Sequence, residues 1–337
     1  MTTMELPRPL SSASASKAKH LARSIAGVST IGPLLALGLA VAFFSLKSGQ
    51  FFQGQNLSLV LQQSIEVGVL AIGQTLVILT AGIDLSCGLV MAFGGIVMTK
   101  LAVHGGVPPI LAILLGIGAS VGFGVLNGTL VTKVRLPAFI VTLGTLNIAY
   151  AAVHLYSNEE TILNLPSAMT FFGRTFSVGG TDFTYGILVM VALYAIAWFV
   201  LSQTAWGSRV YAVGNNPEAA RLAGIRTDRL LISVYAAAGL IYGITAVLLV
   251  ARTEAGNPNA GQTDNLESIT AVVLGGTSLF GGRGIVIGTL IGALIVSVIR
   301  NGLVLIGTSD VYQVLITGIL VIFAVSVDQL THRRSRG

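Results

Sequence analysis

The sequence has few charged residues. Asp, Glu, Lys and Arg together make up 9% of its 337 residues, whereas hydrophobic residues make up 53%. A soluble domain usually carries about 25% charged residues, because it must cover its surface with polar groups. The shortage of charge therefore excludes an ordinary soluble globular protein and indicates that lipid surrounds most of the chain.

Residues that carry metal or redox chemistry are also scarce. Cys87 is the single cysteine, which excludes a disulfide within the chain, and the four histidines show no metal-binding spacing. The sequence contains no GxxxxGK[ST] phosphate loop, no HExxH and no GxSxG. We therefore expect no catalytic residue, no metal site and no cofactor in this chain.

Acidic residues are rare inside the apolar runs. A charge in the bilayer core costs about 2.5–3.5 kcal/mol on the insertion scale, so such residues usually belong to a relay or an ion site. Glu66 is the one acid well within a predicted span and is a candidate pathway or packing residue. The other acids near spans lie at or beyond their ends, which argues against an ion- or proton-coupled transporter: Asp84, Glu267, Asp310 and Asp328.

Long apolar runs and glycine are abundant. A helix needs about 20 apolar residues to cross the hydrocarbon core, and small residues such as the 41 glycines let helices pack closely. The runs do not alternate as the strands of a membrane β-barrel would. The sequence thus predicts an all-α membrane protein with about ten transmembrane helices. These are residues 28–46, 58–80, 85–103, 107–131, 138–156, 184–202, 230–251, 268–282, 285–300 and 311–327.

The eighth and ninth runs are short and separated only by 280–284, so they could instead be broken or re-entrant segments. The domain division that follows is a cytoplasmic tail at 1–27, a transmembrane permease domain at 28–327 and a basic cytoplasmic tail at 328–337.

The basic residues predict which side of the membrane each loop faces. With ten crossings and both termini in the cytoplasm, 14 of the 19 basic residues lie inside, which matches the positive-inside rule. The chain is therefore expected in the cell membrane, and its net charge of +6 needs no nucleic-acid partner. The five basic residues placed outside are Lys47, Lys100, Arg174, Arg252 and Arg300.

A faint internal repeat is also present. Residues 116–128 and 288–302 are glycine-spaced and end in Asn127-Gly128 and Asn301-Gly302. They fall in the fourth and ninth predicted helices. This odd offset would make predicted helices two to five and seven to ten an inverted repeat. Inverted repeats are common in transporters, with the pathway at their interface. Chance likeness of two glycine-rich helices is the alternative.

The inside loop 203–229 contains signals for a short helix. Asn216 is a good N-cap, Pro217 suits the first helical position, and Glu218 favours the positive end of the helix dipole. Gly224 is placed as a C-terminal stop. The pattern predicts a helix at 217–223 that exposes Glu218, Arg221 and Leu222. Such a helix could rest on lipid headgroups or serve as a docking knob for a soluble partner.

A second polar segment, 79–88, connects the second and third predicted helices. Asp84 and Ser86 in this segment can cap the start of the third helix, and a role in gating or partner contact is the alternative. The possible gating or pathway residues are thus Glu66, Asp84, Ser86, Asn127 and Asn301.

Four stretches together resemble the permease subunits of ribose-type ABC sugar importers, the ribose/xylose/fructose-like branch, over nearly the whole chain. They are GQTLVILTAGIDLS at 73–86, LPAFIVTLGT at 136–145, GNNPEAARLAGI at 214–225 and LGGTSLFGGRG at 274–284. Cys87 departs from the valine or other small apolar residue that the family more often has there.

The resemblance implies a type II ABC importer-like permease that works as a homodimer. It would sit on a cytoplasmic ATPase, often with two fused cassettes, which uses ATP, and an extracytoplasmic binding protein would deliver the sugar. The stretch 214–225 looks like the family's coupling helix, with Gly214, Asn216, Pro217, Glu218, Ala219, Ala220, Arg221, Leu222, Gly224 and Ile225. An ABC permease for branched-chain amino acids or another small solute is the alternative substrate class.

Overall fold

The protein is represented by a computed structural model, which describes residues 31–334. Apart from one hairpin, made of β1 (Thr175–Val178) and β2 (Thr181–Thr184), its regular elements are helical. A π-helical turn, Leu130–Val134, extends α4, and a short 3₁₀ turn covers Phe171–Gly173. The helices are Ile31–Lys47, α2 (Gly54–Leu79), α3 (Cys87–Val103), α4 (Pro109–Thr129), α5 (Ala138–Ser157), α6 (Gly186–Gln203), α7 (Ala205–Asn215), α8 (Pro217–Leu222), α9 (Thr227–Thr253), α10 (Asp264–Leu274), α11 (Val286–Leu305) and α12 (Asp310–Arg334).

Six of the described helices are long and apolar enough to cross a membrane: α2, α4 with its π-helical extension, α5, α6, α9 and α11. Three further helices are apolar but shorter: Ile31–Lys47, Cys87–Val103 and Val311–Ser326. The expectation of a helical membrane protein is thereby confirmed, and each of these nine corresponds to one predicted span.

The eighth predicted span, 268–282, is wrong as a continuous helix. α10 has 11 residues and is therefore about 16 Å long, half of the hydrocarbon thickness. It ends at Leu274 because Gly275 and Gly276 follow, and Gly276 has a positive φ of 86°. The broken segment weighed as the alternative is the better description.

The chain still connects the two ends of the molecule across this break. Gly256, before α10, pairs with Ile162 in the predicted outer loop. Gly282, after α10, donates its N–H to the carbonyl of Leu79, at the opposite end of α2 (2.9 Å). The segment 256–263, which consists mostly of turns, and α10 together therefore make the passage that a single helix was expected to make.

Two regular features of the loops were not predicted. The inside loop holds α7 as well as α8, and the outside loop holds the β1–β2 hairpin. α12 also continues beyond 327 to Arg334, into the predicted basic tail. The predicted N-terminal tail at 1–27 lies outside the described residues.

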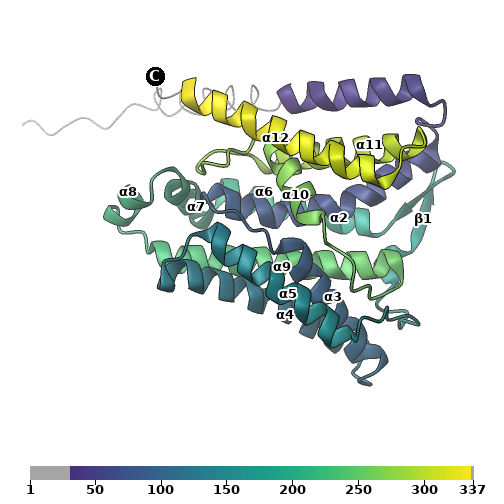
Figure 1. Cartoon of the computed structure of the whole chain (residues 1–337), viewed down its shortest axis with the longest axis horizontal. Helices are drawn as coiled ribbons and strands as arrows, with labels where there is room; N and C mark the ends of the chain where they lie inside the picture. Colours follow the sequence, from purple (N-terminus) through teal and green to yellow (C-terminus); the bar gives the residue numbers. More distant parts are fainter. Residues whose placement is uncertain (1–30, 335–337) are drawn as a thin grey trace, which may run out of the picture.

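The hairpin and α8 lie at opposite ends of the molecule (Figure 1). α2 and α9 contact each other at the centre of the molecule, and each of them is packed by a set of other helices with the same arrangement of contacts. α4 packs on α9, and α11 packs on α2. α3 contacts α4, α5 and α9, whereas α10 contacts α11, α12 and α2. Two sets of four helices thus share one packing pattern.

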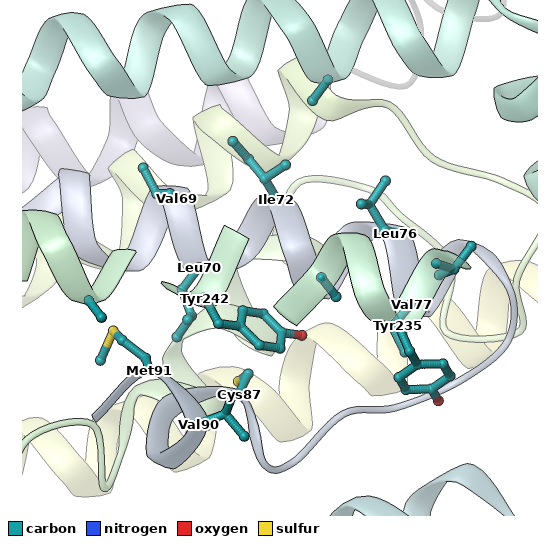
Figure 2. Packing of buried hydrophobic residues seen from close by; sticks show 14 of the residues in the cluster. Val69, Leu70, Ile72, Leu76, Val77, Cys87, Val90, Met91, Tyr235 and Tyr242 are labelled. Atoms are coloured by element: carbon teal, nitrogen blue, oxygen red, sulfur yellow. The ribbon is translucent and has the colours of Figure 1, made fainter. Parts of the chain in front are cut away.

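α2 and α9 pack closely against each other at the centre of the molecule. Figure 2 shows Leu70 and Val77 of α2 with Tyr235 and Tyr242 of α9, and Cys87 lies nearby at the start of α3. All five side chains are buried. A Cβ added to Gly73 would lie 2.5 Å from the Tyr242 ring, so glycine is what lets α2 and α9 meet here.

Candidate coupling surface and translocation pathway

α8 has the caps that its sequence predicts. The Asn216 side chain accepts a hydrogen bond from the Ala219 N–H (3.0 Å), and Pro217 is the first helical residue. Gly224 follows the C-cap with a φ of 87°, a conformation that glycine adopts without strain. The Ile225 N–H then donates to the carbonyl of Ala220 (3.0 Å), which closes the helix.

α8 presents polar and apolar groups to the surroundings of the protein. Ala220 is its one buried residue and faces the body, whereas Glu218, Arg221 and Leu222 are exposed. Leu222, the last residue of α8, is 86% exposed. α8 thus presents one apolar and two charged side chains on its exposed side.

α7 attaches α8 to the membrane-embedded helices. Gly214 at the end of α7 lies so close to α2 that an added Cβ would be 1.8 Å from the Leu79 carbonyl oxygen. The Tyr211 hydroxyl donates to the carbonyl of Gly284 (2.9 Å), and burial raises the pKa of Tyr211 above its usual range. Tyr211 therefore stays protonated and holds the glycine-rich loop 280–284. A movement of α8 would be transmitted to α2 and to this loop.

A basic pocket of about 590 Å³ lies next to α8, at the start of α9. Arg209, Arg226 and Arg229 line it, and no acidic residue does. Trp206 forms one wall and donates its indole N–H to the Ser233 hydroxyl (2.9 Å). This pocket is therefore positively charged.

Asp84, Ser86 and Asn127 come together in a buried cluster. Asp84 Oδ1 accepts from both the N–H (2.9 Å) and the hydroxyl (2.6 Å) of Ser86, and the Asn127 amide donates to that hydroxyl (3.0 Å). The Tyr242 hydroxyl donates to Asp84 Oδ2 (3.3 Å). Ser86 occupies the N-cap position of α3, but neither side chain caps the helix, because Asp84 engages Ser86 instead. The predicted cap is therefore wrong, and the cluster joins α3, α4 and α9.

Glu66 belongs to a different site, near the other end of the molecule. Its carboxylate pairs with Arg252 of α9 (2.5 Å), and Glu267 of α10 pairs in the same region with Arg300 of α11 (3.2 Å). Glu66, Arg252 and Arg300 line a cavity of about 400 Å³ together with Asp264, which we call the outer cavity. Arg252 and Arg300 were two of the five basic residues assigned to the outside.

Asn301 lies apart from both sites. Its amide donates to the Asn56 side chain (3.0 Å), which in turn donates to the carbonyl of Phe51 (2.9 Å). Asn301 thus holds the segment that leads into α2. The structure brings three of the five predicted pathway residues together and places Glu66 and Asn301 in separate surroundings. The sequence could not reveal Arg252 as the partner of Glu66, because 186 positions separate them.

Comparison with known proteins is consistent with a membrane transport function. Residues 56–325 match the family described as "Branched-chain amino acid transport system / permease component". The chain is 48% identical over 303 residues to the fructose import permease protein FrcC of Rhizobium meliloti, covering 88% of this chain and 84% of that protein.

Two further relatives extend the range of transported sugars. The ribose import permease protein RbsC of Bacillus subtilis is 38% identical over 301 residues, covering 89% of this chain and 92% of that protein. The xylose transport system permease protein XylH of Escherichia coli is 29% identical over 358 residues, covering 89% and 91%. The chain belongs to this permease family, so the expectation of a transport protein rather than an enzyme is confirmed.

Proposed function

We propose that this chain forms the transmembrane pathway of an ATP-driven importer for a monosaccharide of the fructose, ribose or xylose type. It performs no chemistry itself. An ATPase bound on the cytoplasmic side supplies the energy, and an extracytoplasmic binding protein delivers the sugar. Two copies of the chain, rocked by ATP binding, alternate between inward-open and outward-open states.

The α8 surface is the observation that carries this proposal. It is a short helix, capped at both ends, with two exposed charges and an exposed leucine, and α7 packs against the end of α2. A lipid-resting helix would direct its apolar residue and cations toward the membrane, whereas α8 protrudes from the end of the molecule (Figure 1). A coupling helix that fits a groove of the ATPase explains the caps, the exposure and the attachment together.

The helix packing supports an inverted repeat within a ten-passage fold. α3, α4 and α5 contact one another as α10, α11 and α12 do, and α3 and α4 pack on α9 as α10 and α11 pack on α2. α3 and α10 are both preceded by a non-helical segment, and Gly88 of α3 lies against Gly261 beside the start of α10. The two half-structures meet at the centre, where transporters of this construction place their pathway.

A branched-chain amino acid is the second candidate substrate, because the family description names it. The three relatives above are named for sugars, and the one with 48% identity is named for fructose. An ion-coupled secondary transporter is the candidate from another class. Arg252 neutralises Glu66 within the chain, so Glu66 is not an unpaired intramembrane acid of the kind such a transporter uses.

Tracer uptake in cells with and without the gene tests the function. The panel contains fructose, ribose, xylose, a polyol and leucine, and each uptake is repeated after the proton gradient is collapsed while ATP is maintained. We expect gene-dependent uptake of one sugar that survives the collapse. Uptake that disappears with the gradient contradicts the ABC mechanism, and gene-dependent uptake of leucine alone contradicts the sugar assignment.

A further inference from the structure

The outer cavity collects polar groups that the coupling surface does not use. It lies between α2, α3, the end of α9, the start of α10 and the segment 254–263, and its volume is about 400 Å³. Charged groups in the apolar part of a membrane protein are costly and rarely retained without a use. The polar groups that matter here are Glu66, Arg252, Asp264, Arg300, Asn257 and Gln262.

Asp264 is the group whose surroundings within the protein are incomplete. It is 7% exposed, it lines the outer cavity, and its Oδ2 atom has no hydrogen-bond partner among the described residues. Its neighbours Glu66 and Glu267 are also acidic, and Glu66 shares a side-chain hydrogen bond with Asp264 that leaves Oδ2 unpartnered. The start of α10 favours a negative charge but supplies no proton to Oδ2. A hydrogen-bond donor inside the cavity would satisfy an atom that is otherwise buried at a cost.

The ion pairs formed by the two arginines of the cavity indicate which class of ligand could supply this donor. Arg252 is engaged with Glu66, and Arg300 is engaged with Glu267. An amino acid would need a cation for its carboxylate and would have to break one of these pairs. A neutral polyhydroxylated molecule breaks neither, because each hydroxyl can donate to a carboxylate and accept from an amide.

The rest of the lining fits the same class of ligand. Asn257 and Gln262 contribute amide groups from the segment 254–263, and both are accessible from the cavity. Met91, Ile96 and Val250 also line the cavity and offer apolar contact to the C–H groups of a sugar ring. A lining that combines polar groups with some apolar surface suits a small polar molecule.

We propose that the outer cavity is a binding site for a monosaccharide within each single permease chain, with Asp264 accepting a hydrogen bond from a sugar hydroxyl. The site rests on the proposed function and adds a step to it: the sugar is held by the permease itself after release from the binding protein. Selection between a sugar and an amino acid then occurs in this chain as well as in the binding protein.

Saturation-transfer NMR on the full chain in lipid nanodiscs, without the binding protein, tests the site. The probes are fructose, ribose, xylose and leucine at millimolar concentration. We expect saturation transfer to at least one of the sugars and none to leucine. Asp264→Asn should weaken the affinity for that sugar by about three- to tenfold, since an amide N–H₂ group replaces the second carboxyl oxygen and cannot accept a hydrogen bond. Asn257→Ala should weaken it by about three- to tenfold.

Glu254→Gln is the matched control, because Glu254 is an exposed acid on the same connecting segment and does not line the cavity. It should bind sugar as the wild type does. Size-exclusion profiles and melting temperatures show whether each variant is folded, and Asn257→Ala keeps the test informative if Asp264→Asn does not fold.

The outcomes separate this site from the proposed function. If cells import a sugar in a gene-dependent manner but the folded chain shows no transfer to it, the site is refuted and the function stands. Equal sugar affinities in Asp264→Asn, Asn257→Ala and Glu254→Gln also refute the site. If no sugar is imported, the proposed function fails and the site fails with it.

Discussion

At the scale of single residues, the glycines divide into those that lie at helix contacts and those that do not. A Cβ added to Gly124 in α4 would lie 2.2 Å from the Tyr235 carbonyl oxygen of α9, whereas Gly118 in the same helix has open space around it. Both lie in one glycine-spaced stretch of sequence. Only the three-dimensional packing shows which of them lets two backbones approach.

We therefore expect Gly124→Ala and Gly118→Ala to differ in stability. Gly124→Ala forces α4 away from α9 and should destabilise the protein by about 1–3 kcal/mol, the range for overpacking. Gly118→Ala adds a helix-favouring residue at no steric cost and should be neutral or slightly stabilising. Melting curves of the detergent-purified variants measure the difference. Equal melting temperatures would contradict the packing of α4 on α9.

The polar residues show how far sequence can assign contacts. Asp84 and Ser86 were expected to cap a helix, because both are short polar residues before an apolar run. They bond each other instead, and Asn127 and Tyr242 complete the cluster from distant parts of the chain. Local propensity identifies residues that need a partner, but the partner is decided by which helices become neighbours.

At the scale of elements, α8 is the part that the sequence predicts best. Its start and stop depend on Asn216, Pro217 and Gly224, whose effects are local and independent of packing. α7 was missed although Thr204 caps its start by accepting a hydrogen bond from the Gly207 N–H (3.2 Å), a local signal that the sequence does carry. The length of α10 was overestimated because the apolar run continues past Leu274, and only the pair Gly275-Gly276 indicates where the helix ends. Local signals therefore located helix ends more reliably than hydropathy did.

Changes on the exposed face of α8 should uncouple transport without preventing membrane insertion. Glu218→Lys and Arg221→Glu reverse charges on the proposed ATPase-facing surface, so we expect affinity for the ATPase to fall by about tenfold or more. Sugar uptake and ATPase co-purification measure the loss. Glu159→Lys reverses an exposed charge in the loop at the other end of the molecule and is the matched control. Wild-type uptake with normal ATPase co-purification in the α8 variants would refute the coupling role.

At the scale of the whole molecule, the contacts test whether the predicted loops fall on consistent sides. Gly282, predicted inside, is bonded to Leu79 near α7, and Asp328 of α12 accepts from the Leu279 N–H in the same region (3.0 Å). Gly256, predicted outside, is bonded to Ile162 of the predicted outer loop. The loops that share a predicted side are therefore neighbours in space, even though one predicted span is a broken segment.

This arrangement predicts which surfaces a membrane-impermeant thiol reagent can reach in intact cells. Cys87 is fully buried, so the wild-type chain should not react and serves as the control. A cysteine at the exposed position of Glu160→Cys should be labelled in intact cells, whereas Arg221→Cys on α8 should be labelled only after the membrane is permeabilised. The basic residues favour this orientation, because moving 14 of them to the outside would oppose the positive-inside rule. The reverse labelling pattern would place α8 outside the cell, where no ATPase could bind it, and would refute both the orientation and the coupling role.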